Sequence, residues 1–204
     1  MIKTADLTTL QYYQQNAGAF VKGTVSADMR DVQMRFLRML PSHAYILDFG
    51  CGSGRDARAF LEMGYRVDAV DGSVELCRLA SEYVGIPVKQ MLFEELSAFE
   101  QYDGIWACAS ILHLPREQLE GVLQKISDAL KAGGVLYTSF KYGEFEGIRD
   151  GRYFTDFTED SFKNLMEGIP SLQTVETWVT GDVRPGRENE RWLNILLEKT
   201  FIHM

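Results

Sequence analysis

The chain has 204 residues, of which 46% are hydrophobic and 25% are charged, a composition typical of a single globular domain. Its formal net charge of -8 argues against an extended nucleic-acid surface, which would need clustered Lys and Arg. No apolar run approaches the length of a membrane-spanning helix, and residues 1–6 lack the charged-then-apolar pattern of a secretory signal. We therefore expect a cytoplasmic protein with no membrane partner.

The cysteines give no sign of a disulfide or a metal site. Cys51, Cys77 and Cys108 show neither CxxC pairing nor metal-ligand spacing, and an odd number of cysteines suits a reducing compartment. A nucleophilic role for Cys51 or Cys108 would need a base partner, which the sequence does not indicate. We expect no metal and one domain over residues 1–204.

The N-terminal part is predicted to be helical. Residues 8–20 are rich in Gln, Tyr and Ala and are typical of a short helix. Ser26 is a candidate N-cap for a second helix, whose apolar side chains recur at helical spacing as far as residue 40. Pro41 is expected to end that helix.

Short apolar runs then alternate with segments of helical periodicity. The predicted strands are 44–49, 65–70, 87–92, 104–108, 135–140, 172–180 and 191–199. The predicted helices between them are 55–63, 73–85, 115–130 and 158–168. This alternation implies a parallel sheet with helices on both faces. Because no helix separates the last two strands, we expect them to pair antiparallel at one edge.

A glycine-rich turn follows the first strand. In Asp48-Phe49-Gly50-Cys51-Gly52-Ser53-Gly54, the alternate glycines let the backbone turn sharply and approach a ligand closely. In an open parallel sheet this turn lies at the carboxyl end of the strand, where ligands bind. Asp71 ends the second strand about 20 residues later, where its carboxylate can accept both ribose hydroxyls of a nucleoside.

These features fit a dinucleotide or S-adenosylmethionine. The dinucleotide pattern GxGxxG would place a glycine at position 55, where this chain has Arg55. The pattern present is GxGxG, preceded by Asp48. That acid can orient the turn and attract the positive end of a methionine moiety, whereas it would repel a pyrophosphate.

Further motifs follow in order at residues 102–109, 111–114 and 130–136. Together with the turn and Asp71, they cover about residues 44–140 and resemble the class I S-adenosylmethionine-dependent methyltransferases. The resemblance is nearest to small bacterial enzymes of the tellurite-resistance type and the methyltransferase-domain group. It implies a Rossmann-like three-layer α/β sandwich, with a mostly parallel seven-stranded sheet and an antiparallel edge strand.

We expect three regions within the domain. Residues 1–43 would be a helical lead-in or lid, residues 44–140 the cofactor-binding core, and residues 141–204 the acceptor-side loops and C-terminal strands.

The resemblance also implies which residues contact the cofactor. The glycine turn would pass under the methionine part, Asp71 would hold the ribose, and the Ala107 carbonyl would lie near the cofactor amine. Many relatives have an acid for the adenine amine where this chain has Leu92, with Glu94 and Glu95 close by. The implied cofactor-binding positions are Asp48, Gly50, Cys51, Gly52, Arg55, Asp71, Gly72, Ser73, Leu92, Phe93, Glu94, Ala107 and Cys108.

Candidate acceptor contacts come from the N-terminal segment and the later loops. His113 is a weak candidate for a general base, because histidine can accept a proton near neutral pH; alternatively it only shapes the pocket. Basic and aromatic residues after the fifth strand suit an anionic or aromatic acceptor, or are solvated loop charges. Tyr12, Tyr13 and Phe20 would form a lid or pack the helix. The candidates are Tyr12, Tyr13, His113, Lys141, Tyr142, Arg152, Tyr153, Arg187 and Trp192.

The sequence therefore predicts a methyltransferase that acts on a small-molecule acceptor by in-line displacement, as a monomer or homodimer. The sulfonium is already activated, so the protein mainly positions the acceptor and excludes water. Nucleic-acid methylation is disfavoured, because residues 107–110 lack the [DNS]PP[YF] motif and no Pro-Cys nucleophile is present. The alternatives are a non-catalytic S-adenosylmethionine-binding regulator and, less favoured, a nicotinamide-dependent dehydrogenase.

Overall fold

The computed structural model describes residues 4–200. The outer ends of the predicted lead-in and of the C-terminal region, 1–3 and 201–204, lie outside the described residues, and so does the start of the segment inspected for a signal pattern. Within the described part, no helix is both long and apolar enough to cross a membrane.

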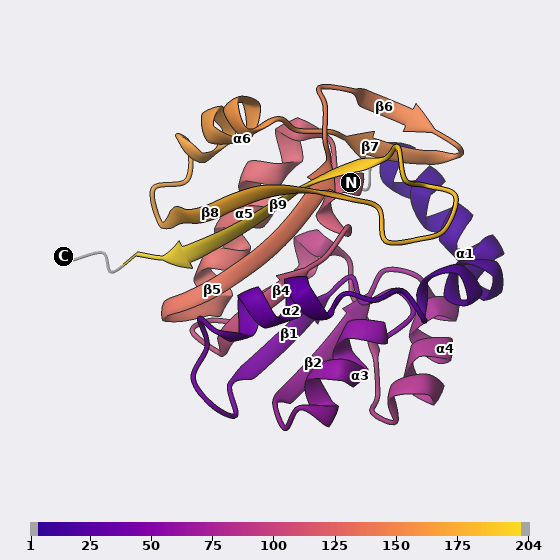
Figure 1. Cartoon of the computed structure of the whole chain (residues 1–204), viewed down its shortest axis with the longest axis horizontal. Coiled ribbons are helices and arrows are strands. Elements are labelled where there is room, and N and C mark those ends of the chain that lie inside the picture. Colours follow the sequence, from indigo (N-terminus) through magenta and orange to yellow (C-terminus); the bar gives the residue numbers. More distant parts are fainter. Residues whose placement is uncertain (1–3, 201–204) are drawn as a thin grey trace.

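A seven-stranded sheet forms the centre of the molecule, in the order β3-β2-β1-β4-β5-β9-β8 (Figure 1). Neighbouring strands from β3 to β5 pair in parallel, whereas β9 is antiparallel to both β5 and β8. The strands are β1 (Tyr45–Phe49), β2 (Arg66–Asp71), β3 (Lys89–Gln90), β4 (Tyr102–Ala107), β5 (Leu130–Lys141), β8 (Leu172–Gly181) and β9 (Arg191–Lys199). This confirms the predicted Rossmann-like fold.

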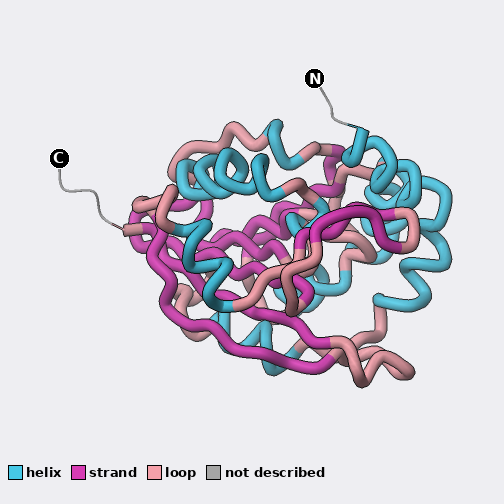
Figure 2. Tube along the Cα trace, turned by 90° about the horizontal axis from the view of Figure 1, so that it is seen from above, coloured by secondary structure: helices cyan, strands magenta, loops and turns pink. Residues whose placement is uncertain are grey.

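Helices cover both faces of the sheet (Figures 1 and 2). Side chains of α2, α3 and α4 form one buried apolar cluster with the sheet, and side chains of α5 and α6 form the other. The helix α1 lies apart from these layers, against α4 and the strand β7. The helices are α1 (Thr4–Thr24), α2 (Arg30–Leu37), α3 (Arg55–Glu62), α4 (Val74–Val84), α5 (Arg116–Ala129) and α6 (Glu159–Met166), with 3-10 turns η1 (Phe93–Glu95) and η2 (Ile111–His113).

The second helix differs from its prediction at both ends. It begins at Arg30, so Ser26 is not its cap. The Asp28 carboxylate accepts the Arg30 amide at 3.1 Å instead. At its other end the helix stops at Leu37, and the chain then turns before Pro41.

Two other elements also differ from the prediction. The third strand has two residues, Lys89–Gln90, because only Val70 and Asp71 of β2 pair with it. A hairpin of β6 (Glu146–Arg149) and β7 (Arg152–Thr155) was not predicted. Its turn is Asp150-Gly151, with positive φ at both residues, as a two-residue hairpin turn requires.

The packing of α2 on the sheet depends on a glycine in β4. A Cβ added at Gly104 would lie 2.6 Å from Phe36 Cζ and 2.8 Å from Leu40 Cδ1. The Phe36 side chain is fully buried and its ring packs against Trp106 at 5.3 Å. A larger residue at position 104 would therefore push this helix off the sheet.

We expect Gly104→Ala to lower the free energy of unfolding by about 1–3 kcal/mol, because overpacking forces side chains out of their preferred rotamers. Urea denaturation measures the change. Gly121→Ala in α5 is the matched control: nothing lies within 4 Å of its added Cβ, so a gain of roughly 0.5–1 kcal/mol is expected. Equal stability of the Gly104 variant and the wild type would contradict this packing argument.

Candidate functional site

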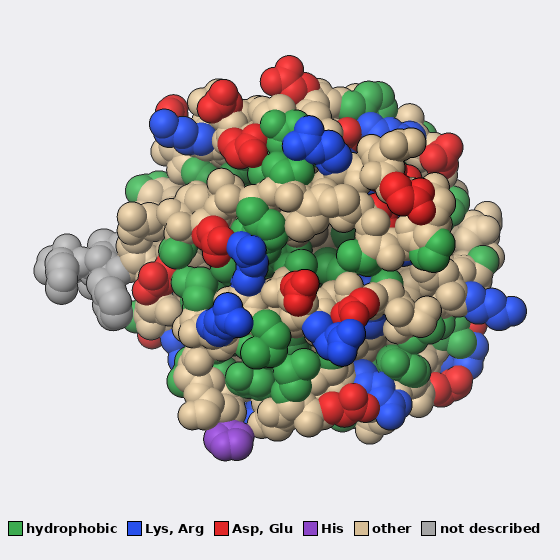
Figure 3. All heavy atoms as spheres, in the orientation of Figure 1, with side chains coloured by type: hydrophobic (Ala, Val, Ile, Leu, Met, Phe, Trp, Pro, Cys, Tyr) green, Lys and Arg blue, Asp and Glu red, His purple; other side chains and the backbone are tan. Residues whose placement is uncertain are grey.

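A cavity of about 770 Å³ lies at the carboxyl ends of β1, β2 and β4. This volume is within the range of about 300–1,000 Å³ typical of small-molecule sites. The wall is built from the glycine turn after β1, the end of β2, α1 with its connection to α2, and parts of β5 and β9. On the face shown in Figure 3, acidic and basic side chains are interspersed.

The glycine turn leads from β1 into α3 and is hydrogen-bonded to the end of β2. Gly50, Gly52 and Gly54 have φ of 82°, 56° and 77°, in the left-handed region that favours glycine. The amides of Gly50 and Cys51 both donate to the Val70 carbonyl, at 3.0 and 2.9 Å. The end of one strand is therefore fixed against the end of the next.

Asp71 is held by backbone amides on both of its oxygens. Oδ2 accepts the Gly52 amide at 2.9 Å, and Oδ1 accepts the Ser73 amide at 2.9 Å. Burial raises the pKa of Asp71, and these hydrogen bonds partly offset that rise. Because a carboxylate oxygen can accept more than one hydrogen bond, each oxygen keeps acceptor capacity in the cavity wall.

The Ser73 hydroxyl makes two hydrogen bonds within the protein. It accepts the Leu76 amide at 3.3 Å, which caps α4, and donates to Gln14 Oε1 at 3.0 Å. The second bond ties α1 to α4. Ser73 is not among the residues that line the cavity.

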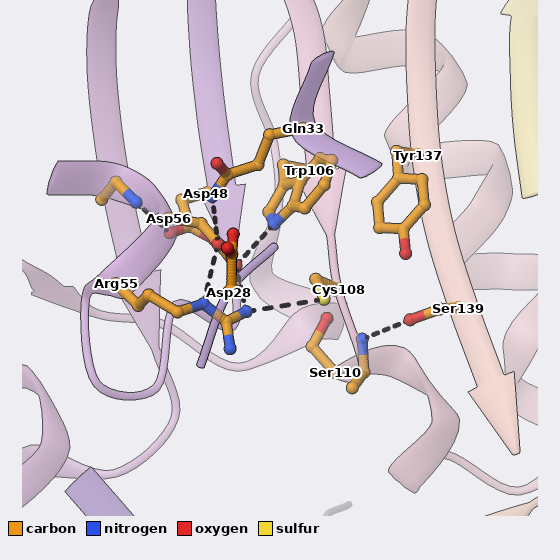
Figure 4. Close-up of polar contacts among 12 residues, drawn as sticks. Asp28, Gln33, Asp48, Arg55, Asp56, Trp106, Cys108, Ser110, Tyr137 and Ser139 are labelled. Atoms are coloured by element: carbon orange, nitrogen blue, oxygen red, sulfur yellow. Dashed lines mark hydrogen bonds and ion pairs between the residues drawn. The ribbon is translucent and has the colours of Figure 1, made fainter. Parts of the chain in front are cut away.

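A buried charge network fills the region under the turn (Figure 4). The Asp56 carboxylate accepts from Arg55 Nη2 at 2.6 Å, Trp106 Nε1 at 2.9 Å and Gln33 Nε2 at 2.7 Å. Burial alone would raise the pKa of Asp56, but Arg55 and the other donors lower it on balance. The Arg55 guanidinium is therefore held in an ion pair with Asp56.

Asp48 points toward the start of α3. Its Oδ2 accepts the Ala57 amide at 3.0 Å. Burial, together with the nearby Asp56 charge, raises the pKa of Asp48 well above its ordinary value. This arrangement fixes the helix start beneath the turn.

His113 lies between α1 and the β6–β7 hairpin. Its Nδ1 is 2.6 Å from the Tyr153 carbonyl, so Nδ1 carries the proton and donates it. Nε2 then accepts from the Tyr13 hydroxyl at 2.8 Å. Burial lowers the pKa of His113 to about 4, so the ring is neutral at pH 7.

The far end of the cavity carries paired charges. Lys141 Nζ contacts the Glu190 carboxylate, lies 3.8 Å from Asp182 Oδ2 and sits 4.1 Å from the Trp192 ring. Burial lowers the pKa of Lys141 to about 8, although Asp182 opposes the shift. At the cavity centre, burial raises the pKa of the Cys108 thiol to about 12, which disfavours a nucleophilic thiolate.

Most predicted site residues come together in this wall, and five do not. Those in the wall are Asp48, Gly50, Cys51, Gly52, Arg55, Asp71, Gly72, Leu92, Phe93, Glu94, Cys108, Tyr13, His113, Lys141, Arg152, Arg187 and Trp192. Those outside it are Ser73, Ala107, Tyr12, Tyr142 and Tyr153. Ala107 is fully buried in β4, and the Tyr153 hydroxyl donates to Glu146, so only the Tyr153 carbonyl faces His113.

Several wall residues were not predicted. Among them are Asp28, Arg30, Ser110, Tyr137, Ser139, Asp182 and Asn194. Phe154 and Arg184, which also line the cavity, belong to the basic and aromatic residues expected after the fifth strand. One sequence pattern could have indicated some of the residues that were not predicted. In β5, polar side chains at every second position, ending at Lys141, interrupt an otherwise apolar strand and lie on one face of it. No group of three or more His, Cys, Asp or Glu side chains in residues 4–200 could hold a metal ion.

Comparisons with known proteins agree with this geometry. A family model described as a methyltransferase domain matches residues 46–134. Ubiquinone biosynthesis O-methyltransferase of Xanthomonas axonopodis pv. citri (strain 306) is 27% identical over 109 residues, which are 50% of this chain and 45% of that protein. The chain thus matches less than half the length of this curated relative.

Two solved structures share the fold. One is Burkholderia thailandensis 1,6-didemethyltoxoflavin-N1-methyltransferase with bound 1,6-didemethyltoxoflavin and S-adenosylhomocysteine, with a TM-score of 0.77 and 22% identity over 98% of this chain and 92% of that chain. The other is an S-adenosylmethionine-dependent methyltransferase from Methanosarcina mazei, with a TM-score of 0.72 and 18% identity over 85% of this chain and 99% of that chain.

Residues 46–134 therefore match a methyltransferase-domain model, and the fold of the chain is the one found in S-adenosylmethionine-dependent methyltransferases. S-adenosylmethionine is the cofactor of this class of enzyme. The narrower resemblance to the tellurite-resistance group stays a prediction.

His113 should make stability depend on pH. Its pKa is about 4 in the folded protein, against about 6.5 for an ordinary histidine, so between pH 7 and pH 5 the unfolded chain takes up a proton and the folded chain does not. The contribution of His113 to the free energy of unfolding is fully present well above pH 6.5 and is lost as the pH falls toward 4. We expect the wild type to lose roughly 2 kcal/mol more than His113→Gln between pH 7 and pH 5, as measured by urea unfolding. Parallel losses in the two proteins would show that this imidazole is not buried in its neutral form.

Proposed function

We propose that this protein transfers the methyl group of S-adenosylmethionine to a small-molecule acceptor. The observation that carries the proposal is the Asp71 carboxylate, oriented by two backbone amides at one end of a cavity that continues past the glycine turn to β5 and β9. One continuous space can therefore take a nucleoside at one end and an acceptor at the other.

The residues at the Asp71 end of the cavity fit S-adenosylmethionine. Asp71 retains acceptor capacity for the two ribose hydroxyls. The Phe93 ring, packed edge-on against Phe49 at 5.0 Å, stands in the wall where an adenine would lie. Gly50 and Gly52 contribute backbone and no side chain to the cavity wall, beside which the methionine part would lie.

Positioning and exclusion of water are the main tasks left to the protein. When bound, S-adenosylmethionine supplies a methyl group already activated by its sulfonium. The helix α1 covers the turn, because a Cβ at Gly52 would lie 2.9 Å from the Phe20 ring. Tyr13 packs edge-on against Phe20 at 5.1 Å and closes the next stretch of the wall. Water excluded in this way cannot compete with the acceptor.

His113 is proposed as an indirect proton acceptor. A hydroxyl or N–H acceptor must lose its proton as its oxygen or nitrogen bonds to the methyl group. The Tyr13 hydroxyl lines the cavity and already donates to His113 Nε2. A proton leaving an acceptor beside Tyr13 could therefore pass through this hydroxyl to the neutral imidazole.

A small acceptor is supported by the shape of the site and by its relatives. The cavity is bounded by α1 on one side and by β5, β9 and residues 180–184 on another. The Burkholderia neighbour binds 1,6-didemethyltoxoflavin, a small molecule, in the same fold.

Titration calorimetry tests the proposal. We expect S-adenosylmethionine and S-adenosylhomocysteine to bind in the micromolar range and NAD not to bind. Asp71→Ala should weaken both adenosyl ligands by at least about 100-fold, because two hydrogen bonds to a charged group are lost. The control, Asp128→Ala, removes an exposed acid of α5 and should leave binding unchanged. Binding of NAD instead, or of none of the three, would sink the methyltransferase proposal.

An acceptor screen separates an enzyme from a non-catalytic binding protein. S-adenosylhomocysteine release is measured with small acids, amines, thiols and tellurite. We expect turnover with at least one class. Tight cofactor binding without transfer to any of them would favour the regulatory alternative.

A further inference from the structure

We propose that Arg152 is the receptor for an oxyanion on the methyl acceptor, so that the acceptor is a small anionic molecule. This inference deepens the proposed function and rests on it. It follows from the pairing of charges around the cavity.

Arg152 differs from the other cations of the cavity wall. Within the described part of the chain, each of the others lies within 4.0 Å of a carboxylate: Arg30 of Asp28, Arg55 of Asp56, Lys141 of Glu190, Arg184 of Asp182, and Arg187 of Glu190. Among the side chains of residues 8–200, no carboxylate lies that close to Arg152. In the same hairpin, Arg149 pairs with Asp156 at 2.8 Å. Arg152 is thus a cation that the described residues leave without a counter-ion.

Aromatic rings hold the Arg152 side chain. The guanidinium carbon lies 4.6 Å from the centre of the Tyr12 ring, 5.2 Å from Phe154 and 6.0 Å from Tyr13. Cation–π contacts of this kind use the face of the guanidinium and not its N–H edge. Part of that edge donates a hydrogen bond to the Tyr13 hydroxyl. The Arg152 Nε is buried and has no hydrogen-bond partner among the described residues.

A buried donor without a partner costs free energy that a ligand can recover. The guanidinium edge presents N–H groups in a planar fork, whose geometry matches two oxygens of a carboxylate or phosphate. The missing partner is therefore an oxyanion that arrives with a ligand.

The place of Arg152 in the fold favours the acceptor over the cofactor as the source of that oxyanion. Along α1, Phe20 packs on the glycine turn, whereas Tyr12 packs on Arg152. Eight residues of helix separate the two, which is roughly 12 Å. Arg152 thus lies beside Tyr13 and His113 and away from the turn that would take the methionine part.

The surrounding side chains indicate the rest of the acceptor. The His113 ring packs edge-on against Phe154 at 4.9 Å and against Tyr13 at 5.4 Å, and all three line the cavity. Aromatic walls favour a flat apolar body. The class of acceptor is therefore a small aromatic or similarly flat molecule that carries a carboxylate or a phosphate.

The test uses the full-length protein saturated with S-adenosylhomocysteine and three probes: benzoate, phenyl phosphate and benzamide. Ligand-observed NMR measures their affinities. We expect one or both anions to bind at least about tenfold more tightly than neutral benzamide, and Arg152→Gln to remove that preference. Arg152→Lys keeps the positive charge without the planar guanidinium and should retain part of the preference for anions. The control Arg78→Gln, on the exposed face of α4, should change nothing.

Two results would overturn the proposal. The first is that no anion binds the wild type better than benzamide. The second is that Arg152→Gln keeps the preference for anions over benzamide. If that variant also binds S-adenosylhomocysteine at least tenfold more weakly, the guanidinium belongs to the cofactor carboxylate. Unchanged thermal unfolding of the variant excludes misfolding as the cause.

If S-adenosylhomocysteine fails to bind the wild type, the proposed function falls by itself. The same probes on the free protein then test the anion site separately. The preference for anions over benzamide needs no cofactor, and neither does its loss in Arg152→Gln.

Discussion

The hydrogen bond from the Gly52 amide to the Asp71 carboxylate joins the ends of β1 and β2, and the site is arranged around it. It requires positive φ at Gly52, which only glycine adopts at low cost. The same carboxylate accepts the Ser73 amide and so fixes the start of α4. One residue at the end of β2 therefore sets the turn, the start of a helix and the polar end of the cavity.

The charged groups of the cavity fall into two kinds. Those of the first kind are satisfied within the protein, as Arg55 is by Asp56, and they fix the wall because breaking a buried pair is costly. Those of the second kind, Asp71 and Arg152, keep unused hydrogen-bonding capacity. Asp71 is an acceptor group at the end of β2, and Arg152 is a donor group in the β6–β7 hairpin. This polarity would orient two ligands in one space.

The sequence predicted the alternating strands of a mostly parallel core and most residues at the glycine-turn end of the cavity wall, because both depend on local chemistry: a glycine turn, an acid at a strand end, and alternating apolar runs. It missed groups whose place depends on distant segments. Asn194 reaches the wall because β9 pairs with β5, and the Ser73 hydroxyl is taken by Gln14, 59 residues away. The hairpin was missed although its turn, Asp150-Gly151, is a strong local signal.

A crystal structure of the protein with S-adenosylhomocysteine tests the central claim most directly. The account predicts both ribose hydroxyls within about 3 Å of the Asp71 oxygens, with the adenine against Phe93 and the amino-acid part over Gly50 and Gly52. A ligand bound elsewhere, or an Asp71 carboxylate that makes no contact with the ribose, would contradict it.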